Sequence, residues 1–304
     1  MAVAGQRDSN PGQAGKQLKL RRKVESMAVA LCLLTALASV SATAAAKVAS
    51  KPRSDPDLRS NAFYILDESG SKVLAARNEG IAAPIASITK LMTTLVVLAA
   101  GQPMEEMIAI TRDDVRETAR SNSRLAPGAR LSRADLLHLA LMSSENRAAH
   151  ALCRSYPGGM PACVSAMNDK ARSLGMTTAR FVEPTGLSSS NVSSPVDLAK
   201  LVRAAAANST IRKYSTDPDH TVYVKGRALE YRSTNSLVEK PDWQVTVQKT
   251  GYIADAGRCL VMQVVIDGRD VVIVLLNSWG KLTRIGDANR IRDWMASSDQ
   301  FRAG

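Results

Sequence analysis

A serine and a lysine three residues apart, Ser87 and Lys90, are spaced for nucleophilic catalysis. They lie in an apolar stretch from Ile85 to Ala100, IASITKLMTTLVVLAA, which predicts a buried helix. Positions i and i+3 of a helix face the same side, so the hydroxyl and the amine come within reach of each other. Because burial disfavours a charged amine, the pKa of Lys90 should fall toward neutrality. A neutral Lys90 could then accept the Ser87 proton and make that oxygen a nucleophile.

Two further short motifs follow along the chain. Ser144-Glu145-Asn146 interrupts a helical pattern, and Lys249-Thr250-Gly251, the only K-T-G, ends a strand-like run. The first two motif types are common by chance, because a second S-x-x-K spans residues 69–72 and S-x-N recurs at 189–191 and 233–235. The order and local context of the three motifs together therefore indicate a serine acyl-transfer site, which no single motif would.

The elements around these motifs predict an α+β fold. A linker at 47–58 precedes a single domain at 59–298, and 299–304 form a short tail. Helical spacing predicts helices within 104–150, with a polar interruption at 121–128, and at 162–174, 196–207 and 284–295. Alternation predicts strands at 62–66, 72–75, 222–224, 244–250, 258–266 and 270–276. Strands at both ends of the domain imply one antiparallel sheet built from the two termini and packed with helices, beside a mostly helical lobe.

Residues 1–46 predict a secretory signal. A basic cluster at 19–23 precedes an uncharged apolar run at 27–40, and small residues with A-x-A cleavage sites follow at 42–46. The apolar run is short for a bilayer span, which needs roughly 20 residues. An uncleaved N-terminal anchor is the alternative, and the native start could be Met1 or Met27. An exported protein is expected.

The expected export bears on the redox state of the cysteines. Cys153 and Cys163 bracket a turn-rich stretch, RSYPGGMPA, and in an oxidising compartment a disulfide is favoured over two free thiols. Cys259 lies in an apolar run and is expected to be a buried structural thiol.

Composition excludes several other classes of protein. The chain is 45% hydrophobic and 22% charged, as globular proteins are, and only 4% aromatic, which excludes an aromatic nucleic-acid stacking surface. The net charge of +12 is partly local, because residues 1–46 carry +4 of it and leave +8 on the rest of the chain. The remaining basic residues are scattered rather than striped, so nucleic acid is not an expected partner. The 3 histidines form no H-x-x-H pair, and no metal or other cofactor is expected.

The three motifs in this order resemble the signature of penicillin-binding proteins and serine β-lactamases. Longer runs resemble the low-molecular-mass D-alanyl-D-alanine peptidases, above all the small D,D-endopeptidase branch. These runs are PIASITKLMT at 84–93, LALMSSENRAA at 139–149, FVEPTGLSS at 181–189 and VQKTGYIADAGRCLVM at 247–262. The resemblance spans residues 61–295 and implies the serine β-lactamase/DD-peptidase fold.

The resemblance also implies residue roles. Ser87 would attack the carbonyl of a D-Ala residue and become acylated, Lys90 would accept its proton, and Ser144 would relay a proton to the leaving amine. Five residues would bind substrate: Asn146, Lys249, Thr250, Gly251 and Tyr252. Among them, Asn146 would contact the peptide amide and Lys249 with Thr250 would bind a carboxylate. The backbone N–H groups of Ser87 and Tyr252 would form the oxyanion hole.

Two acidic residues near the motifs invite a catalytic interpretation. Glu183 could be a deacylating base, but its motif F-V-E-P-T-G-L is similar to the peptidases and favours a structural loop carboxylate. Glu145 is assigned no chemistry and is expected to be solvated or salt-bridged.

The function that the resemblance implies is a periplasmic D,D-endopeptidase that cuts D-Ala–meso-diaminopimelate cross-links in peptidoglycan. Its partners would be peptidoglycan peptide stems, with β-lactams as acylating inhibitors. Typical carboxypeptidases of the family add a C-terminal β-domain and an amphipathic helix, whereas this sequence stops soon after Met295, so membrane association is expected to be loose at most. A D,D-carboxypeptidase, a β-lactamase and an inactive wall-binding module are the alternatives.

Overall fold

The computed structural model describes residues 56–69 and 71–297. All of them belong to the unit that spans residues 55–304. The expected secretory signal at 1–46, most of the linker at 47–58 and the tail at 299–304 lie outside the described residues. Within the described part of the chain, no helix is long and apolar enough to cross a membrane.

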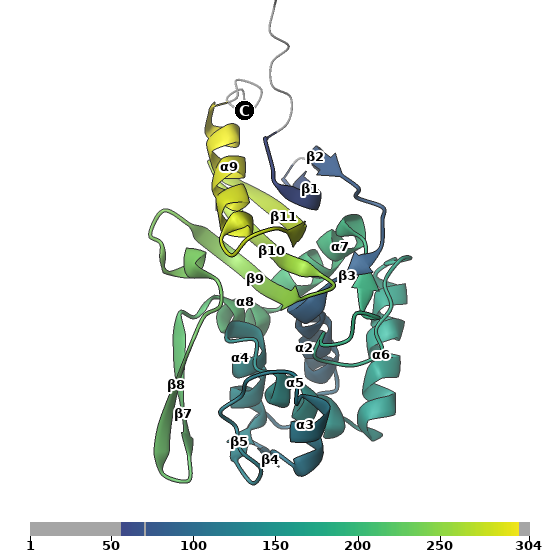
Figure 1. The fold of residues 1–304 in the computed structure, drawn as a ribbon, viewed down its shortest axis with the longest axis vertical. Coiled ribbons are helices and arrows are strands. Elements are labelled where there is room, and N and C mark those ends of the chain that lie inside the picture. Colours follow the sequence, from purple (N-terminus) through teal and green to yellow (C-terminus); the bar gives the residue numbers. More distant parts are fainter. Residues whose placement is uncertain (1–55, 70, 298–304) are drawn as a thin grey trace, which may run out of the picture. The chain divides into compact units, whose positions relative to one another are not determined.

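A five-stranded antiparallel sheet forms the first layer (Figure 1), in the order β2-β1-β11-β10-β9. Both termini of the domain contribute to it, because the first strand pairs with the last, with Tyr64 opposite Val274. This arrangement confirms the sheet expected from the strand-like runs at the two ends of the domain. The strands are β1 (Ser60–Asp67), β2 (Lys72–Arg77), β9 (Gln244–Ile253), β10 (Gly257–Ile266) and β11 (Arg269–Ser278).

Helices cover both faces of this sheet. Side chains such as Leu260 and Ile273 pack against helix α9 (Thr283–Ser297). Their neighbours Val261 and Val274 face the opposite way and join a core with the helices on the other side. Successive strand residues point to opposite faces, which explains why β10 and β11 are apolar almost throughout. The helices of the second face are α2 (Thr89–Ala99), α7 (Pro195–Ala206) and α8 (Ser209–Thr216).

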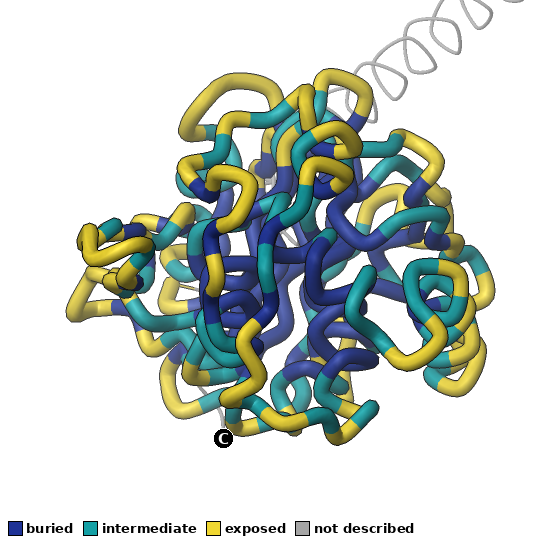
Figure 2. Tube along the Cα trace, turned by 90° about the horizontal axis from the view of Figure 1, so that it is seen from below, coloured by how far each residue is buried: buried dark blue, intermediate teal, exposed yellow. Residues whose placement is uncertain are grey.

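A mostly helical lobe lies beside the sheet, and the buried core runs through the centre of the described unit with exposed loops around it (Figure 2). The lobe contains α3 (Arg112–Glu117), α4 (Arg133–Met142), α5 (Asn146–Arg154) and α6 (Gly159–Ser173). Cys153 and Cys163 form a disulfide that joins α5 to α6, the pairing favoured from the sequence. Cys259 is a buried free thiol on β10, as expected.

The helix expected from residue 104 is wrong. Residues Met107–Ala109 form a short strand, β4, that pairs with β5 (Arg130–Ser132). Along this stretch Met107 is exposed and Ala109 is half-buried, whereas Ile108 and Ile110 are buried. That alternation has the period of a strand, which the short apolar run did not distinguish from a helix.

Several elements were not expected from the sequence. Helix α8 was missed, and the strand expected at 222–224 is part of a hairpin of β7 (Asp219–Val224) and β8 (Arg227–Arg232). Lys225 and Gly226 form its turn, both with positive φ, as a type I′ hairpin turn requires. The remaining short elements are β3 (Ala83–Pro84), β6 (Val192–Ser193) and the 3-10 turns η1 (Ala86–Ile88) and η2 (Ser236–Glu239).

Candidate active site

Ser87 lies in the 3-10 turn η1, immediately before α2. The continuous helix expected from Ile85 is therefore wrong in its first turn, because Ala86 has a φ of 48°, which an α-helix does not accommodate. The expected proximity survives this change. The Lys90 Nζ lies 2.9 Å from the Ser87 Oγ, and Ser87 is half-buried while Lys90 is fully buried.

The Lys90 amine is held entirely by neutral acceptors. Besides Ser87, it donates to the Asn146 Oδ1 at 2.7 Å and to the Thr185 carbonyl oxygen at 2.5 Å. Burial lowers the pKa of Lys90 from 10.5 to about 8, against the smaller opposing effects of Glu183 and Glu145. About a tenth of the amine is therefore uncharged at pH 7, and this neutral form can accept a proton.

Ser144 and Asn146 lie where α4 ends and α5 begins. Ser144 has a φ of 62°, in the left-handed region, and Asn146 is the first residue of α5. Glu145 caps α5 by accepting a hydrogen bond from the Ala148 N–H at 2.9 Å, and it is buried. The expectation that Glu145 is solvated or salt-bridged is therefore wrong, because the free N–H groups at the start of α5 recruit its carboxylate instead.

Lys249, Thr250 and Gly251 lie on β9, an edge strand of the sheet. The Lys249 Nζ is fully buried and donates to the Thr250 carbonyl oxygen at 2.9 Å. Burial, and then the positive charges of Lys90 and Arg284, lower the pKa of Lys249 well below its usual value. The Thr250 hydroxyl shares a hydrogen bond of 2.5 Å with that of Thr234, a residue from one of the chance S-x-N motifs.

Gly186 and Gly251 allow neighbouring segments to pack closely against the backbone around Ser87. A Cβ on Gly251 would lie 3.1 Å from the Ser87 N and 3.0 Å from the Ile85 carbonyl oxygen. A Cβ on Gly186 would lie 1.9 Å from the Ala86 carbonyl oxygen, and its φ of +82° is itself unfavourable for other residues. The backbones of β9 and of the loop at 183–188 therefore pack directly against residues 85–87, because neither glycine has a side chain that would prevent this contact.

Glu183 organises the loop that carries Thr185. Its carboxylate accepts hydrogen bonds from the N–H of Thr185 and the N–H of Gly186, both at 2.6 Å, and from the Asn191 Nδ2 at 3.0 Å. The structure thus agrees with the structural interpretation of Glu183. The loop in turn fixes the Thr185 carbonyl oxygen that holds Lys90.

Arg284, on α9, is the residue near the site that the sequence did not reveal. Its Nε and Nη1 are buried and have no hydrogen-bond partner among the described residues. Burial, and then the charge of Arg258, lower the pKa of Arg284. No local pattern distinguishes this arginine, since only the packing of α9 on the sheet brings its charge near Lys249.

Tyr252 follows Gly251 on β9 and has an exposed side chain, with the Arg258 guanidinium 4.5 Å from its ring centroid. The structure thus brings Ser87, Lys90 and Asn146 into direct contact through one amine, and it places Gly251 against Ser87 from β9. No group of His, Cys, Asp or Glu in the described part of the chain could hold a metal ion. The arrangement offers a nucleophile, a buried base and further cations, which suit acyl transfer to an anionic substrate.

A family model described as D-alanyl-D-alanine carboxypeptidase matches residues 46–280. The chain belongs to this family. Among its relatives, the D-alanyl-D-alanine endopeptidase of Pseudomonas aeruginosa is 41% identical over 271 residues, which cover 87% of each chain. The D-alanyl-D-alanine endopeptidase of Escherichia coli is 41% identical over 279 residues, 91% of this chain and 89% of that one.

Solved structures show the same fold. A variant of the Streptomyces K15 DD-transpeptidase matches with a TM-score of 0.73 at 25% identity, covering 79% of this chain and 98% of that one. The D-alanyl-D-alanine carboxypeptidase of Mycobacterium tuberculosis matches with a TM-score of 0.72 at 26% identity, covering 81% and 94%. The expected serine β-lactamase/DD-peptidase fold is confirmed. The family comprises serine-type D-Ala-D-Ala peptidases of the bacterial cell wall that bind penicillin and act on peptidoglycan.

Proposed function

We propose that this chain is a periplasmic D-alanyl-D-alanine endopeptidase that hydrolyses D-Ala–meso-diaminopimelate cross-links in peptidoglycan. The observation that carries the activity is the buried Lys90 amine, with its lowered pKa, hydrogen-bonded to the Ser87 hydroxyl. The preference for cross-links rests on the 41% identity to two relatives named as endopeptidases.

Acylation begins when the neutral Lys90 amine takes the Ser87 proton. The Ser87 Oγ attacks the D-Ala carbonyl carbon, and the backbone N–H groups of Ser87 and Tyr252 donate to the oxyanion that forms. The C–N bond then breaks, and Ser144 relays the proton that Lys90 accepted to the leaving amine. Water hydrolyses the acyl-serine in the second step, with the same groups moving protons in the reverse direction.

A carboxylate on the substrate is bound on the β9 side of Ser87. Arg284 supplies positive charge there, the Lys249 amine supplies hydrogen-bond donors, and Thr250 supplies a hydroxyl. In the cross-link, the carboxylate beside the scissile amide belongs to the leaving diaminopimelate. Asn146 contacts the peptide amide on the opposite wall, next to the Lys90 amine to which it is already hydrogen-bonded.

The proposal also covers export and domain organisation. Residues 1–46 act as a secretory signal, 47–58 as a linker and 59–298 as the peptidase domain, with a short tail at 299–304. β-Lactams acylate Ser87 because they mimic the D-Ala–D-Ala terminus of the peptide stem.

The proposed activity is tested by the intact mass of the mature protein after mixing with benzylpenicillin, followed over time. We expect a lasting adduct on the wild type and none on Ser87→Ala. The matched control is Ser69→Ala, in the second S-x-x-K of the chain, between β1 and β2; it should acylate like the wild type. If the wild type forms no adduct, the mechanism is wrong and a wall-binding module is favoured, while penicillin consumed without a lasting adduct indicates a β-lactamase.

Substrate preference requires a second assay. We expect the protein to cleave a cross-linked muropeptide dimer, with kcat/KM higher than for a pentapeptide monomer, as monitored by liquid chromatography of the products. The opposite preference would replace the endopeptidase with a D,D-carboxypeptidase while leaving the acyl-serine chemistry intact.

A further inference from the structure

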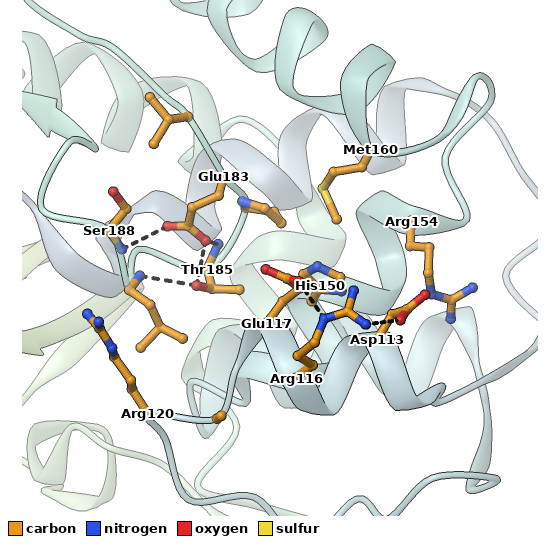
Figure 3. A pocket seen from close by; sticks show the side chains of 14 residues that line it. Asp113, Arg116, Glu117, Arg120, His150, Arg154, Met160, Glu183, Thr185 and Ser188 are labelled. Carbon is orange, nitrogen blue, oxygen red and sulfur yellow. Dashed lines mark hydrogen bonds and ion pairs between the residues drawn. The ribbon is translucent and has the colours of Figure 1, made fainter.

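A cavity of about 730 Å³ adjoins the candidate active site (Figure 3). It lies among α3, α5, α6 and the loop at 182–188, and this loop is a wall common to the cavity and the site. Thr185 lines the cavity, while its carbonyl oxygen accepts the hydrogen bond from Lys90. Helix α5 is a second common wall, because His150 lines the cavity one turn beyond Asn146. A volume of this size falls within the range of small-molecule sites.

The inner wall of the cavity is held by a buried, fully paired cluster. The Asp114 carboxylate is completely buried and contacts the His150 Nδ1 at 2.7 Å and the Arg154 Nε at 3.0 Å. The charge of Arg154 is thus already matched, and the His150 ring is fixed through one nitrogen. The lining carboxylate of Glu183 is likewise engaged, by the backbone N–H groups of its own loop.

The outer wall has unmatched charge of both signs. Arg116 pairs with Asp113 at 2.8 Å and with Glu117 at 3.1 Å, so two exposed carboxylates share one guanidinium and leave one negative charge in excess. Arg120 is exposed and has no carboxylate partner among the described residues. In Figure 3 the Arg120 side chain lies apart from Asp113 and Arg116, at the opposite end of the group of lining residues. A positive and a negative site therefore lie apart on one cavity.

We propose that this cavity is a substrate subsite for a zwitterionic amino-acid head group. Its carboxylate would bind Arg120, and its ammonium would lie near Asp113 and Glu117. The assignment rests on the proposed function, in which the residue before the scissile D-Ala is a meso-diaminopimelate whose free end bears both groups. The subsite would select the acyl side of the substrate, whereas the carboxylate site of Lys249 and Thr250 would bind the leaving side.

The test compares wild type with Arg120→Gln on two substrates: the cross-linked muropeptide dimer, and the same dimer amidated at the carboxylate of the free head group. We expect Arg120→Gln to lower kcat/KM for the unmodified dimer about 10-fold, as loss of a charge-assisted hydrogen bond does. Amidation should lower the wild-type value by a similar factor, and the two proteins should be equal on the amidated dimer. Arg227→Gln, which removes the same charge from β8, is the control and should match the wild type.

The ammonium is tested in the same way. Glu117→Gln should lower kcat/KM severalfold for the unmodified dimer and have no effect once the free amine is acetylated. The subsite is wrong if Arg120→Gln or Glu117→Gln changes modified and unmodified dimers by equal factors, or changes neither.

Benzylpenicillin separates this inference from the proposed function, because it lacks the head group. Its rate of acylation should be equal in wild type, Arg120→Gln and Arg227→Gln. Normal acylation with no head-group preference would overturn only the subsite, whereas a wild type that is not acylated would overturn the proposed function. A pentapeptide monomer carries the same head group, so the comparison holds for a carboxypeptidase as well.

Discussion

Buried ionisable groups have opposite surroundings in the candidate active site and in the helical lobe. In the candidate active site, Lys90 and Lys249 are fully buried, and their amines contact hydroxyl, amide and carbonyl oxygens. In the lobe, the buried Asp114 contacts His150 and Arg154, both of which can be positively charged. The pKa of Lys90 falls to about 8 in favour of its neutral form, and the pKa of Asp114 falls to about 2 in favour of its charged form.

This difference distinguishes a buried group that acts in catalysis, Lys90, from one that stabilises the fold, Asp114. A buried amine without a counterion is costly to protonate, and that cost is what makes Lys90 a base near neutral pH. A buried carboxylate with two cationic partners loses stability if it is removed or protonated. Variants at the two places should therefore separate activity from stability.

The largest effect is expected at the catalytic amine. Lys90→Met should slow acylation by benzylpenicillin about 10²- to 10⁴-fold, because general-base catalysis is lost. The free energy of unfolding in urea should not fall, since a poorly compensated buried amine is removed with it. Lys72→Met, at the exposed lysine of the second S-x-x-K, is the control. An acylation rate within tenfold of wild type would contradict the role of Lys90.

At Asp114 we expect the converse, a loss of stability with little change in the rate of acylation. Asp114→Asn should lower the free energy of unfolding by about 3–5 kcal/mol, because Arg154 and His150 lose their counterion. Acylation by benzylpenicillin should stay within about twofold wherever the protein remains folded. Asp113→Asn, at an exposed neighbour, should cost under about 1 kcal/mol.

The pH dependence of unfolding tests whether the ion pairs of Asp114 stabilise the fold. Because the folded pKa of Asp114 is depressed to about 2, its contribution to stability is present above the unfolded value of about 3.8 and is lost as pH falls toward 2. The difference between wild type and Asp114→Asn should shrink over that interval. A difference that stays constant down to pH 2 would mean that the ion pairs do not stabilise the fold.

Close packing around Ser87 gives a smaller effect. Gly186→Ala should lower the free energy of unfolding by about 2–4 kcal/mol, from left-handed strain plus a clash with the Ala86 carbonyl. It should also slow acylation, because the loop that positions Thr185 must move. Gly175→Ala has a similar φ of +67° but open space around its Cβ, so it should cost only about 1 kcal/mol and leave acylation unchanged. Equal effects of the two variants would contradict the enclosure of Ser87.

The pH dependence of acylation tests the catalytic half of this comparison without any substitution. Lys90 must be unprotonated to accept the Ser87 proton, so the rate should rise about tenfold per unit below pH 8 and level off above it. Stopped-flow acylation from pH 6 to 9 measures this profile. A flat profile between pH 6 and 8 would place the working pKa of the base below 6.

Much of the fold followed from the sequence because its signals are local. The apolar runs of β10 and β11, and the turn between them, predict a buried hairpin without knowledge of the rest of the chain. The errors occurred where a short apolar segment fits two periods, as in β4, or where a carboxylate has several available partners, as with Glu145. Such choices are decided by neighbours that are distant in sequence.

By itself, the sequence determined the Ser87–Lys90 pair, because three residues of helical backbone bring the hydroxyl and the amine together almost regardless of the surroundings. Tertiary structure decided what that pair can do. Asn146 and Thr185 reach Lys90 from 56 and 95 residues away. Arg284 comes near Lys249 only because α9 packs on the sheet. Burial and partner geometry set the pKa of an amine, and both arise from long-range packing that no local pattern encodes.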